Sequence, residues 1–139
     1  MKLTKLNSDK FINITVCSNI QWEEVVSSKI QKSVKDFLKK YWFHDPIIEE
    51  FYIPGSKLRI DLFNIRLKIA IEVSPSAVHC EYNKFFHRGN RFNFLDKVKK
   101  DEQKRNWCNI NNIRLVELYD DDIKNISWEL FRDKYNIEL

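Results

Sequence analysis

Apolar residues recur with helical spacing in an early segment of the chain, "SSKIQKSVKDFLKKYW". They fall on one face of a helix, and lysines fill the other positions. Ser28 and Gln31 stand in the S-x-x-Q relation of a capping box, which marks the beginning of the helix. The pattern predicts an amphipathic helix over residues 27–42. Its apolar positions are Ile30, Val34, Phe37, Leu38 and Tyr41.

The pattern then changes to short apolar runs bounded by turn formers, which is typical of strands. Strands are predicted at Ile47–Ile53, Leu58–Phe63 and Leu67–Ser74, with a turn at Pro54-Gly55 and a second, short turn between the last two strands. Together they form a three-stranded meander. An earlier segment, Phe11–Val16, also has short β character.

From Pro75 to Asn93 the chain is polar and aromatic, and we expect a long surface loop. A helix at Phe94–Asn109 and an apolar strand at Ile113–Leu118 follow. The tail "DDDIKNISWELFRDKY" predicts one more helix, capped by Ser127 with Glu129 and packing Trp128 and Phe131. This order predicts an α/β fold, a small mixed sheet flanked by helices on both faces, in one domain over residues 1–139.

Composition limits the function classes. The 139 residues are 43% hydrophobic and 32% charged with Gly 2 and Pro 3, typical of a globular protein and not of a disordered one. The net charge of +4 is compatible with a polyanionic partner and only weakly favours one. There is no signal-peptide block or membrane-length apolar run, so we expect a cytoplasmic protein without a membrane partner.

The three cysteines show no C-x-x-C pair, which argues against a disulfide framework and favours free thiols. Zinc held by His79, Cys80 and Cys108 is an alternative, but it lacks a recognised ligand spacing.

Two acidic residues interrupt the apolar strand pair "KLRIDLFNIRLKIAIEV". If residues 65–68 form the loop, Asn64 lies opposite Ile69, and the same register places Asp61 directly opposite Glu72 on one face. Opposed carboxylates repel unless a cation lies between them, and Mg²⁺ prefers one or two carboxylates. Alternatively, each acid faces solvent and pairs with a lysine such as Lys57 or Lys68.

The run "RIDLFNIRLKIAIEVSPSAVH" resembles the core of the PD-(D/E)xK nuclease superfamily, especially its very-short-patch-repair-like and phage homing-type branch. In that branch an aspartate, a glutamate about eleven residues later and a histidine follow in order, and these places fall on Asp61, Glu72 and His79. The segment "KKDEQKRNWCNINNIRLVELYDDD" is similar to the helix, turn and strand that close the family's core, so the resemblance covers roughly residues 28–122.

The resemblance implies a restriction-endonuclease-like core and Mg²⁺-dependent hydrolysis of phosphodiester bonds in DNA, with Mn²⁺ as a substitute. Asp61, Glu72 and the carbonyl of Val73 would hold the ion. His79 would act as a general acid or contact a phosphate.

Two departures from the family pattern bear on activity. The E-x-K lysine is replaced by Ser74, and Lys104 is our preferred substitute because Lys97, Asp101 and Lys104 share one helix face. On the first helix, Gln31 stands where the family often has a metal-binding glutamate. Glu49 and Glu50 are candidate replacements, and strand alternation allows only one of them to face Asp61.

Cations alternate with aromatic residues in the loop "NKFFHRGNRFNF". The cations can bind phosphates, while the rings either stack on bases or anchor the loop. The predicted nucleic-acid-binding residues are Lys84, His87, Arg88, Arg91, Lys97 and Lys100. The lysines of the first helix extend this surface or are merely solvated; they are Lys29, Lys32, Lys35, Lys39 and Lys40.

We therefore expect a metal-dependent endodeoxyribonuclease of phage or mobile-element type, acting in the host cytoplasm if phage-encoded. A homodimer is compatible with double-strand cutting, because one such site cuts one strand. Ser74 and Gln31 favour a rival hypothesis, a nuclease fold whose site has decayed into a nucleic-acid-binding subunit. A third hypothesis is RNA cleavage, because viral cap-snatching endonucleases of this superfamily also place a hydroxyl residue after the glutamate and a lysine on a later helix.

Overall fold

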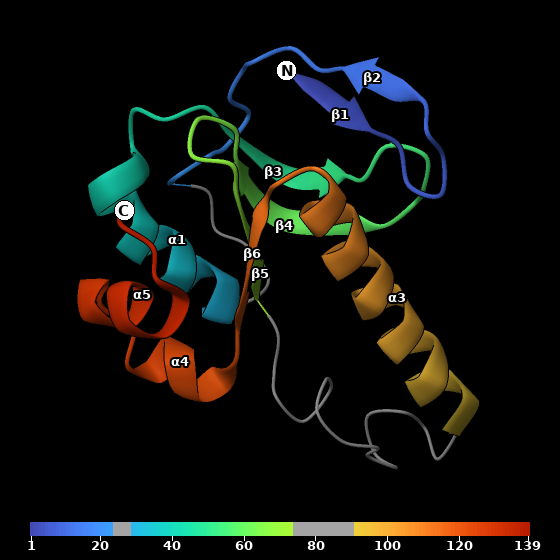
Figure 1. Cartoon of the computed structure of the whole chain (residues 1–139). Coiled ribbons are helices and arrows are strands. Elements are labelled where there is room, and N and C mark those ends of the chain that lie inside the picture. The colour runs from blue at the N-terminus through green and yellow to red at the C-terminus, as the bar shows by residue number, and fades with distance from the viewer. Residues whose placement is uncertain (24–28, 74–90) are drawn as a thin grey trace.

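The structure, a computed structural model, describes residues 1–23, 29–73 and 91–139 (Figure 1). Side chains are described over the same ranges except at 91–94 and 120. In chain order the elements are β1 (Lys2–Thr4), β2 (Phe11–Asn13), α1 (Lys29–Trp42), β3 (Ile47–Tyr52), β4 (Arg59–Asn64), β5 (Ile69–Val73), α3 (Arg91–Ile110), β6 (Arg114–Leu118), α4 (Asp120–Lys124) and α5 (Trp128–Tyr135).

The central sheet has four strands in the order β3-β4-β5-β6. The first three form an antiparallel meander, as predicted, and β6 pairs parallel to β5. Asn64 lies opposite Ile69, so the predicted four-residue loop and register of the β4–β5 hairpin are confirmed. A parallel neighbour requires a crossover connection, and here the crossover contains α3.

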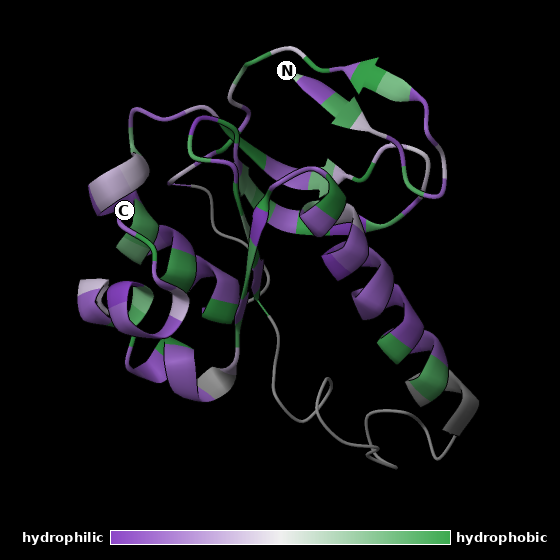
Figure 2. Ribbon diagram, viewed as in Figure 1, coloured by the Kyte–Doolittle hydropathy of each residue, from purple (hydrophilic) through white to green (hydrophobic). Residues whose placement is uncertain are grey.

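Helices cover both faces of this sheet, which confirms the mixed α/β class (Figure 1). One apolar cluster joins α1 and α5 to the sheet; its fully buried members include Val34, Leu38, Trp42, Leu62, Ile71 and Phe131. The other joins α3 and the β1–β2 hairpin to the opposite face; its members include Leu3, Phe51, Ile60, Phe63, Ala70, Trp107 and Cys108. In Figure 2 the ribbon of α1 carries both apolar and polar residues along its length, as an amphipathic helix does.

The helix α1 begins at Lys29, and of its predicted apolar positions Val34 and Leu38 are fully buried and Ile30 and Phe37 half-buried. Tyr41 is exposed instead, and Trp42, which was not predicted, completes the buried stripe. Ser28, the predicted cap, lies outside the described residues. A second expectation for this helix is wrong. Lys35 is fully buried, because it pairs with Glu49 at 2.6 Å and donates to the carbonyl of Gln21 at 2.7 Å, so it does not contribute to a solvated lysine face.

The N-terminal strand is shorter than expected. β2 ends at Asn13, and Val16 is exposed beyond it. Its partner β1 was not predicted, and the pair packs on α3 through Leu3 and through a hydrogen bond from Trp107 Nε1 to the carbonyl of Thr4 at 2.7 Å.

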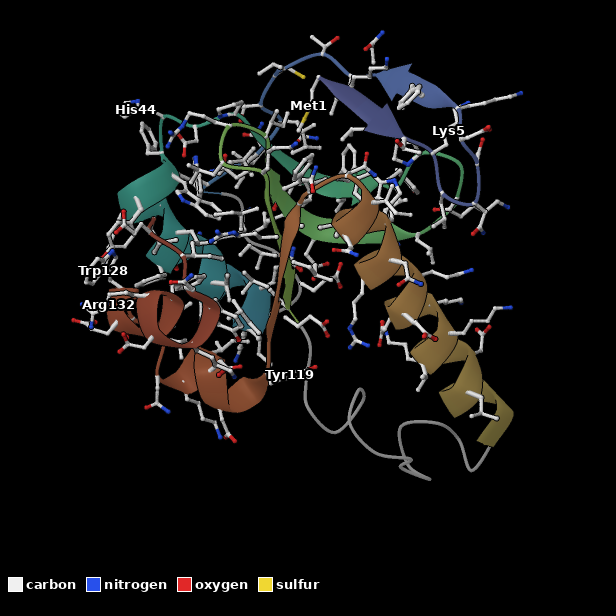
Figure 3. The ribbon with its side chains drawn as sticks, in the orientation of Figure 1. Met1, Lys5, His44, Tyr119, Trp128 and Arg132 are labelled. Carbon is white, nitrogen blue, oxygen red and sulfur yellow. The ribbon has the colours of Figure 1, made fainter. Side chains whose placement is uncertain are left out.

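The C-terminal segment contains two helices where one was predicted. The short α4 ends at Lys124, and α5 begins after Ser127, whose hydroxyl accepts from the backbone N–H of Leu130 as expected of a cap. Phe131 is buried, as predicted. Trp128 is only half-buried, and Arg132 lies over its ring at 4.7 Å on the outer side of the helix (Figure 3).

In the described part of the chain, none of the helices is both long enough and apolar enough to cross a membrane.

Candidate functional site

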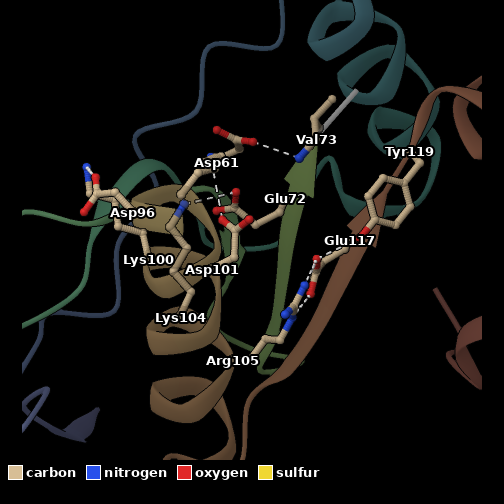
Figure 4. Close-up of polar contacts among 11 residues, drawn as sticks. Asp61, Glu72, Val73, Asp96, Lys100, Asp101, Lys104, Arg105, Glu117 and Tyr119 are labelled. Carbon is tan, nitrogen blue, oxygen red and sulfur yellow. Dashed lines mark hydrogen bonds and ion pairs between the residues drawn. The ribbon is translucent and has the colours of Figure 1, made fainter. Parts of the chain in front are cut away.

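Asp61 and Glu72 lie at the open end of the β4–β5 hairpin. The hydrogen-bonded ladder ends at the pair Leu62 and Ile71, and Asp61 and Glu72 are the next residue outward on each strand. Asp61 accepts a hydrogen bond from the backbone N–H of Val73 at 2.8 Å through its Oδ2 atom (Figure 4). The two carboxylates therefore come together at the place where the predicted register puts them.

Glu72 is buried, with 8% of its surface exposed, although it carries a carboxylate. Its Oε2 atom lies 3.3 Å from Lys104 Nζ, whereas its buried Oε1 atom has no hydrogen-bond partner among the described residues. A buried carboxylate oxygen without a donor is costly, because it has lost its hydration without replacement.

The two acids disfavour each other's ionised form. Burial and, next to it, the charge of Asp61 raise the pKa of Glu72 to about 7, against the opposing effect of Lys104. Burial also raises the pKa of Asp61, with the hydrogen bond from Val73 acting in the opposite direction. The single lysine in contact with Glu72 does not neutralise two ionised carboxylates, so the centre attracts additional positive charge.

Lys104 reaches this centre from α3, as the sequence predicts for the replacement of the motif lysine. The charge of Lys97 also lowers the pKa of both carboxylates, and Lys97 pairs with Asp101 at 3.6 Å. Lys100 instead forms a surface pair with Asp96 at 3.1 Å, in which both side chains are 52% exposed. The predicted face Lys97, Asp101 and Lys104 is thus turned toward the sheet.

Glu50 and Glu49, the candidate third acids, take different directions from β3. Glu49 pairs with the buried Lys35. Glu50 has a left-handed backbone (φ 54°) between two paired positions, is exposed, and pairs with Arg59 at 3.3 Å. Its charge still raises the pKa of Asp61, so of the two acids Glu50 acts on the centre, and its role as a ligand stays a prediction.

A second charged cluster next to the centre was missed by the sequence analysis. Arg105 on α3 donates to both carboxylate oxygens of Glu117 on β6, at 2.6 and 2.9 Å, and the Tyr119 hydroxyl lies 3.1 Å from Glu117 Oε2. The signal that could have found Glu117 is the one that singled out Glu72, an acid inside the apolar strand "RLVEL".

The other candidates divide into those that the structure places and those that it does not. Gln31 lies in the first turn of α1 and is half-buried; a ligand role stays a prediction. Arg91 is the first residue of α3. The predicted long loop therefore ends before Asn93. Ser74, His79, Cys80, Lys84, His87 and Arg88 lie outside the described residues.

Metal ions in proteins are bound by clusters of side chains such as those of His, Cys, Asp and Glu. Over residues 1–23, 29–73 and 91–139, no three or more His, Cys, Asp or Glu side chains form a group that could hold a metal ion. The buried Cys108 does not favour the zinc alternative, since burial raises the pKa of its thiol to about 12. What the described residues offer is a pair of carboxylates with a lysine beside it.

Comparison with known proteins places the chain near viral proteins. It is 35% identical over 66 residues to uncharacterized protein 033L of Invertebrate iridescent virus 3, an alignment covering 48% of this chain and 33% of the relative. It is 36% identical over 61 residues to uncharacterized protein 307L of Invertebrate iridescent virus 6, covering 44% and 30%. The matched segments span about a third of these relatives. No family model and no solved structure matches the chain.

Proposed function

We propose that this chain is a metal-dependent endonuclease that hydrolyses phosphodiester bonds in DNA on a restriction-endonuclease-like core. The observation that carries the proposal is the convergence of Asp61, Glu72 and Lys104 at the open end of a central hairpin. Three features favour a catalytic role over a purely structural one there: Glu72 is buried and Asp61 half-buried, the pKa values of both are raised, and one Glu72 oxygen lacks a donor among the described residues.

These residues fit a hard divalent ion such as Mg²⁺ or Mn²⁺. Mg²⁺ is commonly bound through one or two protein carboxylates and keeps positions for water and phosphate oxygens. The Oε1 atom of Glu72 receives no hydrogen bond from the described residues, so it can coordinate an ion. When both carboxylates are ionised, they carry more negative charge than Lys104 offsets. Asp61, Glu72 and the carbonyl of Val73 would hold the ion.

When bound there, a divalent ion polarises a phosphate and lowers the pKa of a coordinated water. The chain's own residues then have separate tasks. Asp61 is oriented by the Val73 N–H, which bonds one oxygen and so fixes where the other points. Lys104 brings an ammonium group beside Glu72, where it can donate to an attacking water or to charge developing on a phosphate oxygen. Burial keeps bulk water away from Glu72.

The rival function is a nucleic-acid-binding subunit without activity. It is favoured by Ser74 at the position of the motif lysine, and by the finding that the described acids form a pair and no larger group. A substrate panel separates it from the nuclease, and including RNA tests the third hypothesis in the same experiment.

The test incubates the protein with supercoiled plasmid, single-stranded DNA and RNA in Mg²⁺, Mn²⁺ or EDTA. We expect metal-dependent cutting of DNA, reduced at least about 100-fold by Asp61→Ala or Lys104→Met. Matched controls are Asp133→Ala and Arg132→Met, which remove an exposed pair on α5 away from the predicted nucleic-acid-binding residues. Binding without cutting in every metal would overturn the proposal in favour of the subunit, and cutting confined to RNA would replace DNA as the substrate.

A further inference from the structure

The Arg105–Glu117 pair has the geometry of a bidentate fork. Arg105 Nε lies 2.6 Å from Glu117 Oε1 and Nη2 lies 2.9 Å from Oε2, while the Tyr119 hydroxyl donates to the same Oε2 atom. The hydrogen bonds from Arg105 lower the pKa of Glu117, so this carboxylate is ionised at neutral pH. Both ends of the acceptor are therefore occupied, and the guanidinium is held in one plane.

This fork lies directly beside the carboxylate centre. Glu117 on β6 is the register partner of Glu72 on β5, and neighbouring residues of paired strands share a face of the sheet. Arg105 follows Lys104 on α3, so both cations reach the same sheet face from one helix turn (Figure 4).

The fork leaves Arg105 with unused donors. A guanidinium has five N–H groups, and the two contacts with Glu117 use one from Nε and one from Nη2. The side chain is 49% exposed, so the remaining donors can meet a ligand from solvent. An ion pair this exposed adds little to stability, whereas a preoriented guanidinium matches the oxygens of a phosphate.

We infer that Arg105, oriented by Glu117 and Tyr119, binds a backbone phosphate of the nucleic acid strand, next to the phosphate presented to Asp61 and Glu72. The inference deepens the proposed function and depends on it for the identity of the ligand as nucleic acid. Arg105 is the contact residue. Glu117 and Tyr119 are positioning residues, because they act through the guanidinium.

The molecule contains a matched control for this arrangement. Arg66 forms the same fork with Asp45, at 2.7 and 3.0 Å, at the opposite end of the β4–β5 hairpin. Its exposure, 58%, is similar to that of Arg105. Arg66→Gln therefore removes the same charge and the same kind of contact, away from the carboxylate centre.

The test measures binding of labelled single-stranded and duplex oligonucleotides in EDTA over a salt series, so that no cutting is needed. We expect Arg105→Gln to weaken binding about 5- to 10-fold near 0.1 M salt and to lower the slope of log K against log salt by about one. Arg66→Gln should change neither quantity. If the two variants weaken binding equally, or if the wild-type protein does not bind at low salt, the inference is overturned.

Two charge-conserving variants test the positioning role. Arg105→Lys should keep the salt slope yet weaken binding, because lysine cannot form the fork. Tyr119→Phe, with Tyr52→Phe on the exposed side of β3 as its control, should weaken binding about 2- to 3-fold at an unchanged slope, as expected for loss of one orienting hydrogen bond. Unchanged affinity in both Arg105→Lys and Tyr119→Phe would overturn the positioning role.

The outcome for the inference is separable from that for the nuclease. If Asp61→Ala abolishes cutting but Arg105→Gln binds as the wild type does, the phosphate position is wrong and the nuclease stands. If no cutting occurs in any metal but Arg105→Gln shows the altered slope, the phosphate position stands on a binding protein.

Discussion

The two ends of the β4–β5 hairpin carry similar acidic and basic side chains, but the pKa values of their acids are shifted in opposite directions. At the closed end, Asp45 accepts from the Arg66 guanidinium and from the amide of the buried Asn64. Burial alone would raise the pKa of Asp45, but these hydrogen bonds outweigh it and the pKa is lowered. At the open end, burial dominates and the pKa values of Asp61 and Glu72 are raised.

This difference in pKa shifts shows which end of the hairpin stabilises the fold. Asp45 prefers to be ionised in the folded protein, so its charge stabilises the loop end of the hairpin. Glu72 prefers to be neutral, so its charge destabilises the folded state at neutral pH. Because this acid does not stabilise the sheet, its presence there favours a functional role in which the ionised carboxylate binds a ligand. Strongly shifted pKa values of this kind are concentrated at functional sites. Removing the acidic group should therefore raise the free energy of unfolding at the open end and lower it at the closed end.

The largest expected effect is that of Glu72→Gln. The pKa of Glu72 is about 7 in the folded protein against an ordinary value of 4.5, so the unfolded chain releases this proton first as the pH rises. Wild-type stability then falls between about pH 4.5 and 7, by up to about 3 kcal/mol. Urea unfolding in EDTA should show Glu72→Gln more stable than the wild type at pH 8 by up to that amount, and equal to it at pH 4. Equal stability at pH 8 would contradict the raised pKa of Glu72.

At the closed end, by contrast, removing the acidic group should destabilise the folded protein. Asp45→Ala removes the acceptor for the buried Asn64 amide and should lower the free energy of unfolding by about 2 kcal/mol at pH 7. Because the folded pKa of Asp45 lies below 3.8, its ionic contribution is present above that pH and is lost as the pH falls through the folded pKa. The difference from wild type should shrink there. Asp133→Ala, which removes an exposed pair with Arg132, is the control and should change little.

A divalent ion bound at the open end should stabilise the folded protein and so reduce the difference between the two ends of the hairpin. If Asp61 and Glu72 bind Mg²⁺, an ion concentration about ten times the dissociation constant stabilises the folded protein by about 1.4 kcal/mol, or roughly 4 °C in Tm. Differential scanning fluorimetry at pH 7.5 should show this shift in the wild type and in Asp96→Asn but not in Asp61→Asn or Glu72→Gln. An equal shift in all four proteins would mean that Mg²⁺ acts elsewhere.

The smallest expected effect is that of Lys104 on the pKa of Glu72. The charge and hydrogen bond of Lys104 lower the pKa of Glu72 against the effect of burial, so Lys104→Met should raise that pKa further. A carbon-detected NMR titration of the Glu72 carboxyl group measures the change directly. Lys100→Met, whose partner Asp96 lies on the surface, should leave the Glu72 titration where it is. A Glu72 pKa that falls or does not move in Lys104→Met would show that the ion pair is not formed.

Much of the sheet was predictable because strand alternation and loop length together fix a register. Once residues 65–68 form the loop, Asn64 must face Ile69, and Asp61 and Glu72 must be the next pair beyond the ladder. Lys104 was predictable because helical spacing places it with Lys97 and Asp101 on one face. The nuclease activity itself, the core that the resemblance implies and the metal remain predictions.

Other features depend on contacts that no local pattern encodes. β1 has three residues, too few for a periodic signal, and it forms because Leu3 packs against α3 from a hundred residues away. Lys35 was assigned to the solvated face because lysine is seldom buried, yet Glu49 on another element supplies its counter-charge. The partnership of Arg105 and Glu117 likewise joins a helix to a strand, and only their packing reveals it.

The order of these connections along the chain bears on the folding reaction. Asp61 and Val73 are 12 residues apart and meet as soon as the hairpin closes, whereas Lys104 lies 32 residues from Glu72 and arrives only when the crossover helix docks. Local contacts form before distant ones because closing a short loop costs less entropy. The nascent hairpin therefore brings together two acids before their lysine is present, and refolding in stopped-flow experiments should be faster at pH 4.5 than at pH 7.5.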